Sequence, residues 1–251
     1  MTCAGRMTDG TVRMGRMRTS RWWLTVATVG VLVLTSGCSL FRSSGEQTSQ
    51  VREIQGVTSV RLLTSGNLSI TTGGTESLTV TAGASDLTGL TSQVIDGTLI
   101  LDNKDSIGSG EIAYALTVGP LDRLEVSGSG NASGIGTLRG DSTVLASGSG
   151  SVELTGLEMT GVVVDLSGSG AVTLGGTADT QQITSSGSGD YDGSSLLTTE
   201  TDIEVDGSGN ARVQVTGRLS ATVNGSGDVT YTGNPQQIDR NVSGSGEITP
   251  G

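Results

Sequence analysis

The stretch that decides the fold spans residues 121–174 and reads LDRLEVSGSGNASGIGTLRGDSTVLASGSGSVELTGLEMTGVVVDLSGSGAVTL. It contains the tripeptide Gly-Ser-Gly three times, and further copies lie on both sides of it. The copies begin at positions 108, 128, 148, 168, 187, 207, 225 and 244, with spacings of 18 to 20 residues. A period in this range is typical of solenoids, in which each repeat is one structural unit stacked on the next.

Apolar and polar residues alternate on both sides of each tripeptide. Val144 and Ala146 stand four and two places before one tripeptide, and Val152 and Leu154 stand two and four places after it. A period of two predicts β-strands with one buried face. The sequence therefore predicts coils of strand, glycine corner and strand, stacked about 4.8 Å apart on an apolar interior.

The tripeptides themselves are predicted to form the corners of the coils. We expect their glycines to supply positive φ angles and to let the backbones of neighbouring coils approach closely. The serine between them is expected to form a structural ladder along the stack, because a hydroxyl both donates and accepts hydrogen bonds. These serines are Ser129, Ser149, Ser169, Ser188, Ser208, Ser226 and Ser245. A disordered Gly-Ser linker is the alternative, but it would have no reason to keep apolar residues in phase.

The repeat covers residues 120–249, and the preceding segment, 51–119, is less regular. Its strand-like runs, with a hairpin signal at Asp96-Gly97, predict a β-rich cap that protects the open edge of the solenoid. The whole chain has 41 glycines and is 33% hydrophobic, which argues against a bulky globular core. The predicted fold class is all-β, a β-solenoid of about 20 residues per coil with a less regular N-terminal β cap.

Residues 1–37 have the layout of a secretory signal of lipoprotein type. Arginines precede an apolar run of 13 residues, Trp22 to Leu34, which is shorter than the roughly 20 residues of a membrane-spanning helix. The following Leu34-Thr35-Ser36-Gly37-Cys38 resembles a lipobox, with Thr35 where leucine is usual. This predicts cleavage before Cys38 and a diacylglycerol on its thiol; an uncleaved membrane anchor is the alternative. The polar residues 38–50 predict a flexible tether.

Several of these segments together resemble the head GIN domain family, a domain of unknown function named for auto-transporter adhesins. The resemblance covers about residues 51–249 and is carried by VIDGTLI at 94–100, LDRLEVSGSG at 121–130, the later Gly-Ser-Gly coils and YTGNP at 231–235. It implies a β-helix-like fold, right-handed, on a cell-surface or periplasmic protein. No catalytic residues come with the resemblance, and none are assigned.

The chain contains no histidine. Its absence excludes Ser-His-Asp and Cys-His catalysis and removes the commonest metal ligand. After cleavage Cys38 would be the only cysteine, so zinc sites built on paired cysteines are excluded as well. The sequence therefore predicts a protein that is not an enzyme and has no cofactor.

Carboxylates are the remaining candidates for chemistry. Asp202, Glu204 and Asp206 alternate with apolar residues, so they are expected to share the outer face of one strand. Glu125, Asp165 and Glu204 fall in one outward column, two coils apart each time. A pair of carboxylates could serve a glycosidase, but the favoured interpretation is a solvated acidic face.

A second polar group follows the corner. Asp190, Asn210 and Asp228 occupy equivalent places in three successive coils, and Asp192 lies beside them. Oxygen ligands from stacked coils could hold Ca²⁺, which makes these residues weak calcium candidates. The favoured interpretation is again a set of outward polar residues, and no metal site is assigned.

The charge balance limits the partners. Cleavage would remove five of 14 basic residues and one of 25 acidic residues, leaving a net charge of 9 − 24 = −15, so nucleic acid is not an expected partner. The sequence predicts a non-catalytic protein held by lipid at Cys38 on the extracytoplasmic face of a bacterial membrane. It would act as a binding or structural scaffold for an envelope polymer or surface protein, and the family resemblance implies the role of an adhesin. A polysaccharide lyase or hydrolase on a β-helix and an accessory of envelope-stress sensing remain the alternatives.

Overall fold

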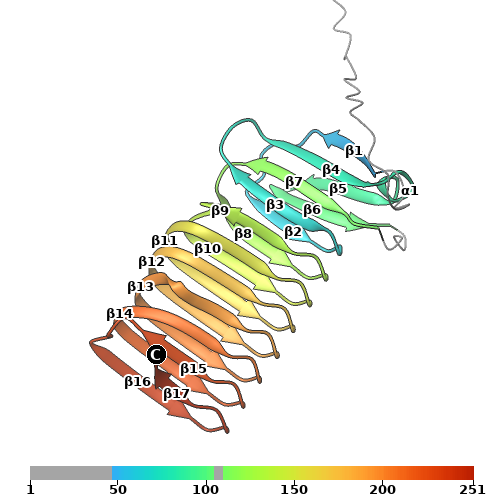
Figure 1. Cartoon of the computed structure of the whole chain (residues 1–251). Helices are drawn as coiled ribbons and strands as arrows, with labels where there is room; N and C mark the ends of the chain where they lie inside the picture. Colours follow the sequence, from blue (N-terminus) through green and yellow to red (C-terminus); the bar gives the residue numbers. More distant parts are fainter. Residues whose placement is uncertain (1–46, 105–109) are drawn as a thin grey trace, which may run out of the picture. The chain divides into compact units, whose positions relative to one another are not determined.

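The computed structural model describes residues 47–104 and 110–251 (Figure 1). Strands make up 65% of these residues, and the one helix among them is the short α1 (Ala84–Leu87). Within the described ranges no helix has the length and hydropathy needed to cross a membrane. The predicted signal peptide, residues 1–37, and the predicted attachment residue Cys38 lie outside the described residues.

The strands fall into an N-terminal group and a repeat group. The first group is β1 (Gln47–Arg52), β2 (Ser59–Leu62), β3 (Asn67–Thr72), β4 (Ser77–Gly83), β5 (Leu90–Ile95), β6 (Thr98–Asn103) and β7 (Ala113–Val118). The second is β8 (Leu121–Val126), β9 (Ala132–Ile135), β10 (Leu138–Ala146), β11 (Val152–Leu166), β12 (Val172–Ser185), β13 (Tyr191–Val205), β14 (Ala211–Val223), β15 (Val229–Thr232), β16 (Gln237–Val242) and β17 (Ile248–Pro250).

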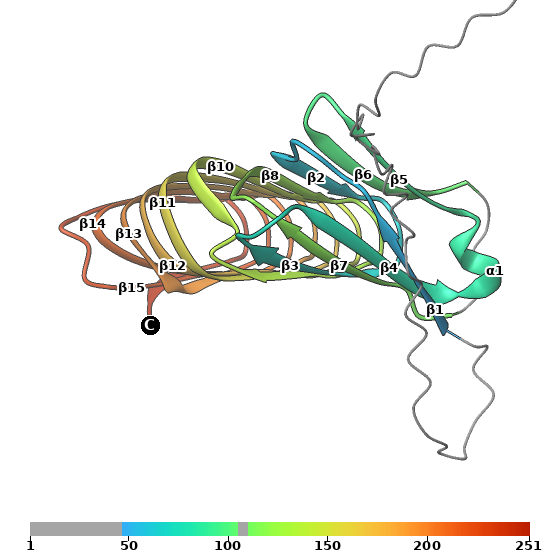
Figure 2. The same cartoon turned by 90° about the horizontal axis from the view of Figure 1, so that it is seen from above.

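The repeat group stacks in parallel, each strand on its equivalent in the next coil. Val144 lies beside Leu124 on one side and Val164 on the other, and Val152 lies beside Val172, 20 residues later. Viewed from above, successive coils lie behind one another (Figure 2). The β-solenoid predicted from the sequence is confirmed, and the structure gives it about six turns.

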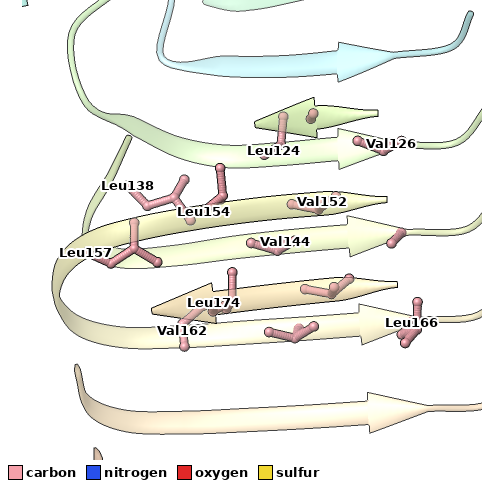
Figure 3. Close-up of a cluster of buried hydrophobic side chains, with 14 of the residues drawn as sticks. Leu124, Val126, Leu138, Val144, Val152, Leu154, Leu157, Val162, Leu166 and Leu174 are labelled. Carbon is pink, nitrogen blue, oxygen red and sulfur yellow. The ribbon is translucent and has the colours of Figure 1, made fainter. Parts of the chain in front are cut away.

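The interior of the stack is filled by the alternating apolar residues. Leu124, Val144, Leu154 and Leu174 are fully buried, and Figure 3 shows them between the two sides of the coil, together with equivalent residues from neighbouring coils. Because equivalent side chains meet in columns, each coil covers the apolar surface of the one before it. A single coil could not bury that surface alone, which makes stacking the main source of stability.

The Gly-Ser-Gly corners bring the backbones of neighbouring coils into direct contact. A Cβ atom on Gly148 would overlap the carbonyl oxygen of Gly128, and one on Gly150 would overlap that of Gly130. The same carbonyl of Gly128 accepts hydrogen bonds from the amides of Ser149 (3.2 Å) and Gly150 (3.4 Å). The expected close approach is therefore confirmed.

The other expectation for these glycines, a positive φ, is wrong. In the described part of the chain, positive φ angles occur at glycines outside the tripeptides, such as Gly97 and Gly136. Glycine is required at the corners because any side chain would overlap the backbone of the preceding coil. The corner glycines do not adopt the left-handed backbone conformation.

The N-terminal region is partly solenoid, and its stacking order differs from its chain order. Strand β2 pairs with both β6 and β8, and β3 pairs with both β7 and β9, all in parallel. The coil of β2 and β3 is therefore enclosed between two coils that come later in the sequence. Its corner reads Thr64-Ser65-Gly66, and the Thr64 carbonyl accepts a hydrogen bond from the Gly130 amide (3.1 Å). This corner has no Gly-Ser-Gly, so the repeat motif does not predict it.

The rest of the N-terminal region forms the cap. Strands β1, β4 and β5 add to the sheets in antiparallel pairs, β1 with β4, β4 with β7 and β5 with β6. The hairpin predicted at Asp96-Gly97 is confirmed, with φ angles of 48° and 76°.

The folded unit begins earlier than the predicted end of the tether. Strand β1 starts at Gln47, so residues 47–50 are strand and not tether. Its side chains are mostly exposed and polar, and backbone pairing with β4 holds it in place. Such a strand carries no hydrophobic alternation, which is why the sequence did not indicate it.

A substitution at one corner tests the backbone contact. Gly148→Ala should lower the free energy of unfolding by about 3 kcal/mol, the upper end of the usual range for overpacking, because a backbone carbonyl cannot move aside as a side chain can. Urea unfolding measures the loss. Gly119→Ala is the matched control, since nothing lies within 4 Å of a Cβ there, and it should be close to neutral. Equal stabilities of the two variants would contradict the corner contact.

Candidate functional site

The outer face of the strands that lead into the corner carries the predicted acidic column. Glu125 lies beside Leu145 and Leu145 beside Asp165, while Thr184 separates Asp165 from Glu204. The column is therefore confirmed, with its carboxylates two coils apart. The uncharged residues between them keep these like-charged carboxylates apart.

The acidic residues at the end of β13 and directly after it lie on the outer face of the solenoid. Asp202, Glu204 and Asp206 are all exposed and alternate with buried residues, as expected. The Asn224 side-chain amide donates to Glu204 Oε1 (3.3 Å) and to Asp206 Oδ1 (2.7 Å). This arrangement is that of a solvated acidic face, crosslinked between coils by an amide.

Glu125 differs from the other members of its column because it forms a network of charged contacts. The enclosed strand β2 places Arg61 directly beside it, and Arg61 Nη2 lies 3.0 Å from Glu125 Oε1. Arg123 Nη2 lies 3.5 Å from the other carboxylate oxygen, and the Ser127 hydroxyl donates to Oε1 at 3.1 Å. Only 14% of the Glu125 side chain is exposed. The network ties the enclosed coil to the first coil of the regular repeat.

The network also changes the acidity of Glu125. Burial alone would raise its pKa, but the hydrogen bonds from Arg61 and Ser127, with the charges of Arg61 and Arg123, outweigh burial and hold the pKa below its ordinary value. Sequence reasoning placed Glu125 in the outward column but missed the ion pair. Arg61 lies 64 residues away, and only the enclosed position of β2 brings the two together.

The weak calcium candidates bind backbone amides instead of converging on one point. Asp190 Oδ1 accepts a hydrogen bond from the backbone amide of Asn210 (2.8 Å). In the same way, Asn210 Oδ1 accepts one from the backbone amide of Asp228 (3.1 Å). Asp228 Oδ1 continues the series with the Glu247 amide (2.9 Å). These residues form a ladder in which each side chain supports the next coil just after the corner.

Asp192 stands apart from this ladder. Its Oδ1 accepts from the hydroxyl (2.6 Å) and the amide (3.0 Å) of Ser194, and the hydroxyl contact is the main reason that the pKa of Asp192 is lowered. Among residues 47–104 and 110–251, no three His, Cys, Asp or Glu side chains are grouped as metal ligands would be.

The corner serines form a column, as their spacing predicts. Their hydrogen bonds along the stack are backbone bonds, for example from the Ser169 amide to the Gly148 carbonyl (3.0 Å) and from the Ser188 amide to the Gly168 carbonyl (3.0 Å). The serine side chains are exposed to solvent. The ladder expected between hydroxyls is thus replaced by one between backbone groups, and the hydroxyls line one edge of the solenoid.

Several hollows interrupt the surface of the described residues, and two of them lie near residues named above. One, of about 410 Å³, lies over Gly161 between Asp141 and Thr180, with Glu200 and Arg218 at its rim. A Cβ on Gly161 would come within 2.9 Å of Asp141 Oδ1 and 3.0 Å of Thr180 Oγ1, so these two side chains close in over the glycine. The other, of about 490 Å³, is lined by residues of β3, β9 and β11, including the exposed Ile135.

Comparison with known proteins gives one family match. A family model described as "Putative auto-transporter adhesin, head GIN domain" matches residues 57–235. No curated protein sequence is significantly similar to the chain.

Several crystal structures share the fold. A "putative adhesin" from Bacteroides fragilis NCTC 9343 has a TM-score of 0.78 at 22% identity, covering 82% of this chain and 98% of that chain. A "putative lipid binding protein" from Parabacteroides distasonis ATCC 8503 has a TM-score of 0.66 at 20% identity, covering 83% and 98%. A "putative adhesin" from the same organism has a TM-score of 0.60 at 18% identity, again covering 83% and 98%. At these identities the likeness is one of fold alone.

The lowered pKa of Glu125 predicts how stability depends on pH. Because the folded pKa lies below the unfolded one, the charged contacts stabilise the fold above about pH 4.3, the ordinary value. Their contribution is lost as the pH falls through the folded pKa.

Glu125→Gln should therefore be less stable than the unmodified protein at pH 7, with a difference that shrinks toward pH 3. Urea unfolding at both pH values measures it, and a difference independent of pH would contradict this account. Glu200→Gln, at an exposed pair 3.8 Å from Arg218, is the control and should show little effect.

Proposed function

The chain belongs to the auto-transporter adhesin head GIN domain family, and on this basis we propose that it is a lipid-anchored, non-catalytic adhesin of the bacterial envelope. The observation that carries the proposal is the in-register stack, which presents columns of outward side chains at equal spacing. A surface of this kind suits an extended or repetitive partner, such as an envelope polymer or surface protein, because each coil can offer the same contact again.

The charge of the outer faces narrows the class of partner. Between Arg139 and Arg212 the sequence contains no basic residue, while acidic residues such as Asp165 and Asp202 recur throughout. A surface of one sign attracts cationic or neutral hydrogen-bonding groups and repels anions. Polymers with amino or hydroxyl groups fit this surface, and nucleic acids do not.

Open faces also favour binding over catalysis. The carboxylates of the acidic column lie exposed or, at Glu125, held in ion pairs. Catalytic carboxylates are usually enclosed in a cleft that excludes water and changes their pKa. The hollow over Gly161 holds the Glu200–Arg218 ion pair at its rim.

Anchoring through Cys38 fits the start of the folded unit. Eight residues, 39–46, separate Cys38 from Gln47, where β1 begins. Even fully extended, the nine residue-to-residue steps from Cys38 to Gln47 reach only about 30 Å, at about 3.3 Å each. The lipid would therefore hold the N-terminal cap close to the membrane surface.

Labelling with radioactive palmitate tests the anchor. Cys38→Ala should remove the label from the full chain and release the protein from the membrane fraction. Cys3→Ala is the matched control, because this cysteine lies within the predicted signal peptide and its loss should change neither property. Equal labelling of the Cys38→Ala variant and the unmodified chain would overturn the lipid anchor.

Adhesion can be tested after the carboxylates of the outer acidic face are neutralised. The full chain displayed on cells should retain them on immobilised envelope polysaccharide or surface protein, and a variant with Asp165, Asp202, Glu204 and Asp206 changed to their amides should retain fewer cells. A control variant carries Glu53 and Glu76 of the N-terminal region changed to Gln, and should behave like the unmodified chain. Polysaccharide cleavage that is lost in the four-residue variant would contradict the non-catalytic proposal.

A further inference from the structure

The solenoid ends at its C-terminal coil in an open strand edge. Among the described strands, β16 pairs with β14 and β17 pairs with β15, each on one side only. Their other sides carry backbone amides and carbonyls without a strand partner. Such an edge can accept a further strand from another polypeptide.

One residue of this last coil breaks the apolar pattern of the interior. The register places Arg240 beside Ala221, and Ala221 beside Ile203, in an inward column that is otherwise apolar. The Arg240 guanidinium lies over the Tyr231 ring, 5.6 Å from its centroid, and Nη1 donates to the Ile248 carbonyl (3.3 Å). No ion pair in residues 47–104 and 110–251 includes Arg240. The end of the core therefore carries a cation without a carboxylate partner.

Apolar side chains flank this cation on the same face. Ile238 is 36% exposed and Val242 is 46% exposed, whereas Leu219 and Val223, which lie beside them one coil earlier, are fully buried. A hollow of about 540 Å³ adjoins them, lined by Tyr231, Pro235, Ile238 and Pro250 among others. The edge thus offers unpaired backbone, two apolar side chains and one cation between them.

We propose that this end binds an extended strand of a partner protein, which adds to β16 and presents a carboxylate to Arg240 between two apolar side chains. Backbone hydrogen bonds would supply affinity, and the guanidinium–carboxylate pair would supply selectivity. The proposal deepens the proposed adhesin function by naming a partner class, and it rests on that function only in placing the partner outside the cytoplasm.

A second copy of this chain does not fit the same edge. Antiparallel pairing of two β16 strands with their inward faces together would bring two Arg240 side chains close to each other in a buried interior, where like charges repel strongly. The edge strands of the N-terminal region, β1 (QTSQVR) and β5 (LTSQVI), contain no Asp or Glu. Arg240 would therefore select a partner strand and also disfavour stacking of copies.

The experiment uses the full chain purified in detergent and a fluorescent peptide, acetyl-Thr-Val-Thr-Glu-Thr-Val-Thr-amide, whose alternate residues match the face of β16. Fluorescence anisotropy should show saturable binding, with affinity at least about tenfold higher than for the same peptide with Gln in place of Glu. Hydrogen exchange should show new protection at residues 237–242. Equal affinity for the two peptides, no binding at millimolar peptide, or protection elsewhere would overturn the proposal.

Variants of the protein test the role of Arg240. Arg240→Gln should lose the preference for the Glu peptide, and Arg240→Glu should prefer a peptide with Lys at that position. Arg218→Gln, on the outer face of the preceding coil, should keep the original preference, and urea unfolding checks that all variants fold. Sedimentation that shows the unmodified chain associating through residues 237–242 would assign the edge to a second copy instead.

The two proposals can fail separately. If the displayed chain adheres to its polymer but no peptide binds, the strand site is overturned and the adhesin function stands. If the peptide binds as described but the displayed chain retains no cells, the strand site stands and the adhesin proposal fails.

Discussion

The fold depends on backbone contact between coils at the glycine corners. At each corner from Gly148 onward, the glycine carbonyl of the coil before occupies the space that a side chain would need. Amides such as those of Ser149 and Ser169 then bond to these carbonyls. Because the corners fix the distance between coils, the apolar columns behind them meet in register. The positions of the outward side chains follow from the same spacing.

The periodicity of the sequence was sufficient to predict this core. A regular period of 18 to 20 residues and strict alternation at residues such as Val144 and Val152 predict stacked strands with little ambiguity, because a shift of one residue would turn every apolar side chain outward. The enclosed coil of β2 and β3 could not be predicted. Its Thr-Ser-Gly corner lacks the repeat motif, and its place depends on pairing with strands far along the chain.

Candidate sites were harder to predict because a side chain's role depends on its neighbours. The column positions of Asp190, Asn210 and Asp228 were correct, but an acidic residue after a corner can bind either a cation or the amide of the next coil. The structure shows amide contacts. Polar residues inside the core were also missed: Gln181 is buried and donates to the Tyr191 hydroxyl, and Gly193 leaves room for the tyrosine ring.

Amide hydrogen exchange at the corner serines tests the central claim most directly. The side chains of Ser149, Ser169 and Ser188 are exposed, so exposure alone would suggest fast exchange. If the corners hold the coils together, their amides should exchange only through unfolding of the stack, as slowly as the amides of the buried strands. Exchange at the rate of an unstructured peptide would contradict the account.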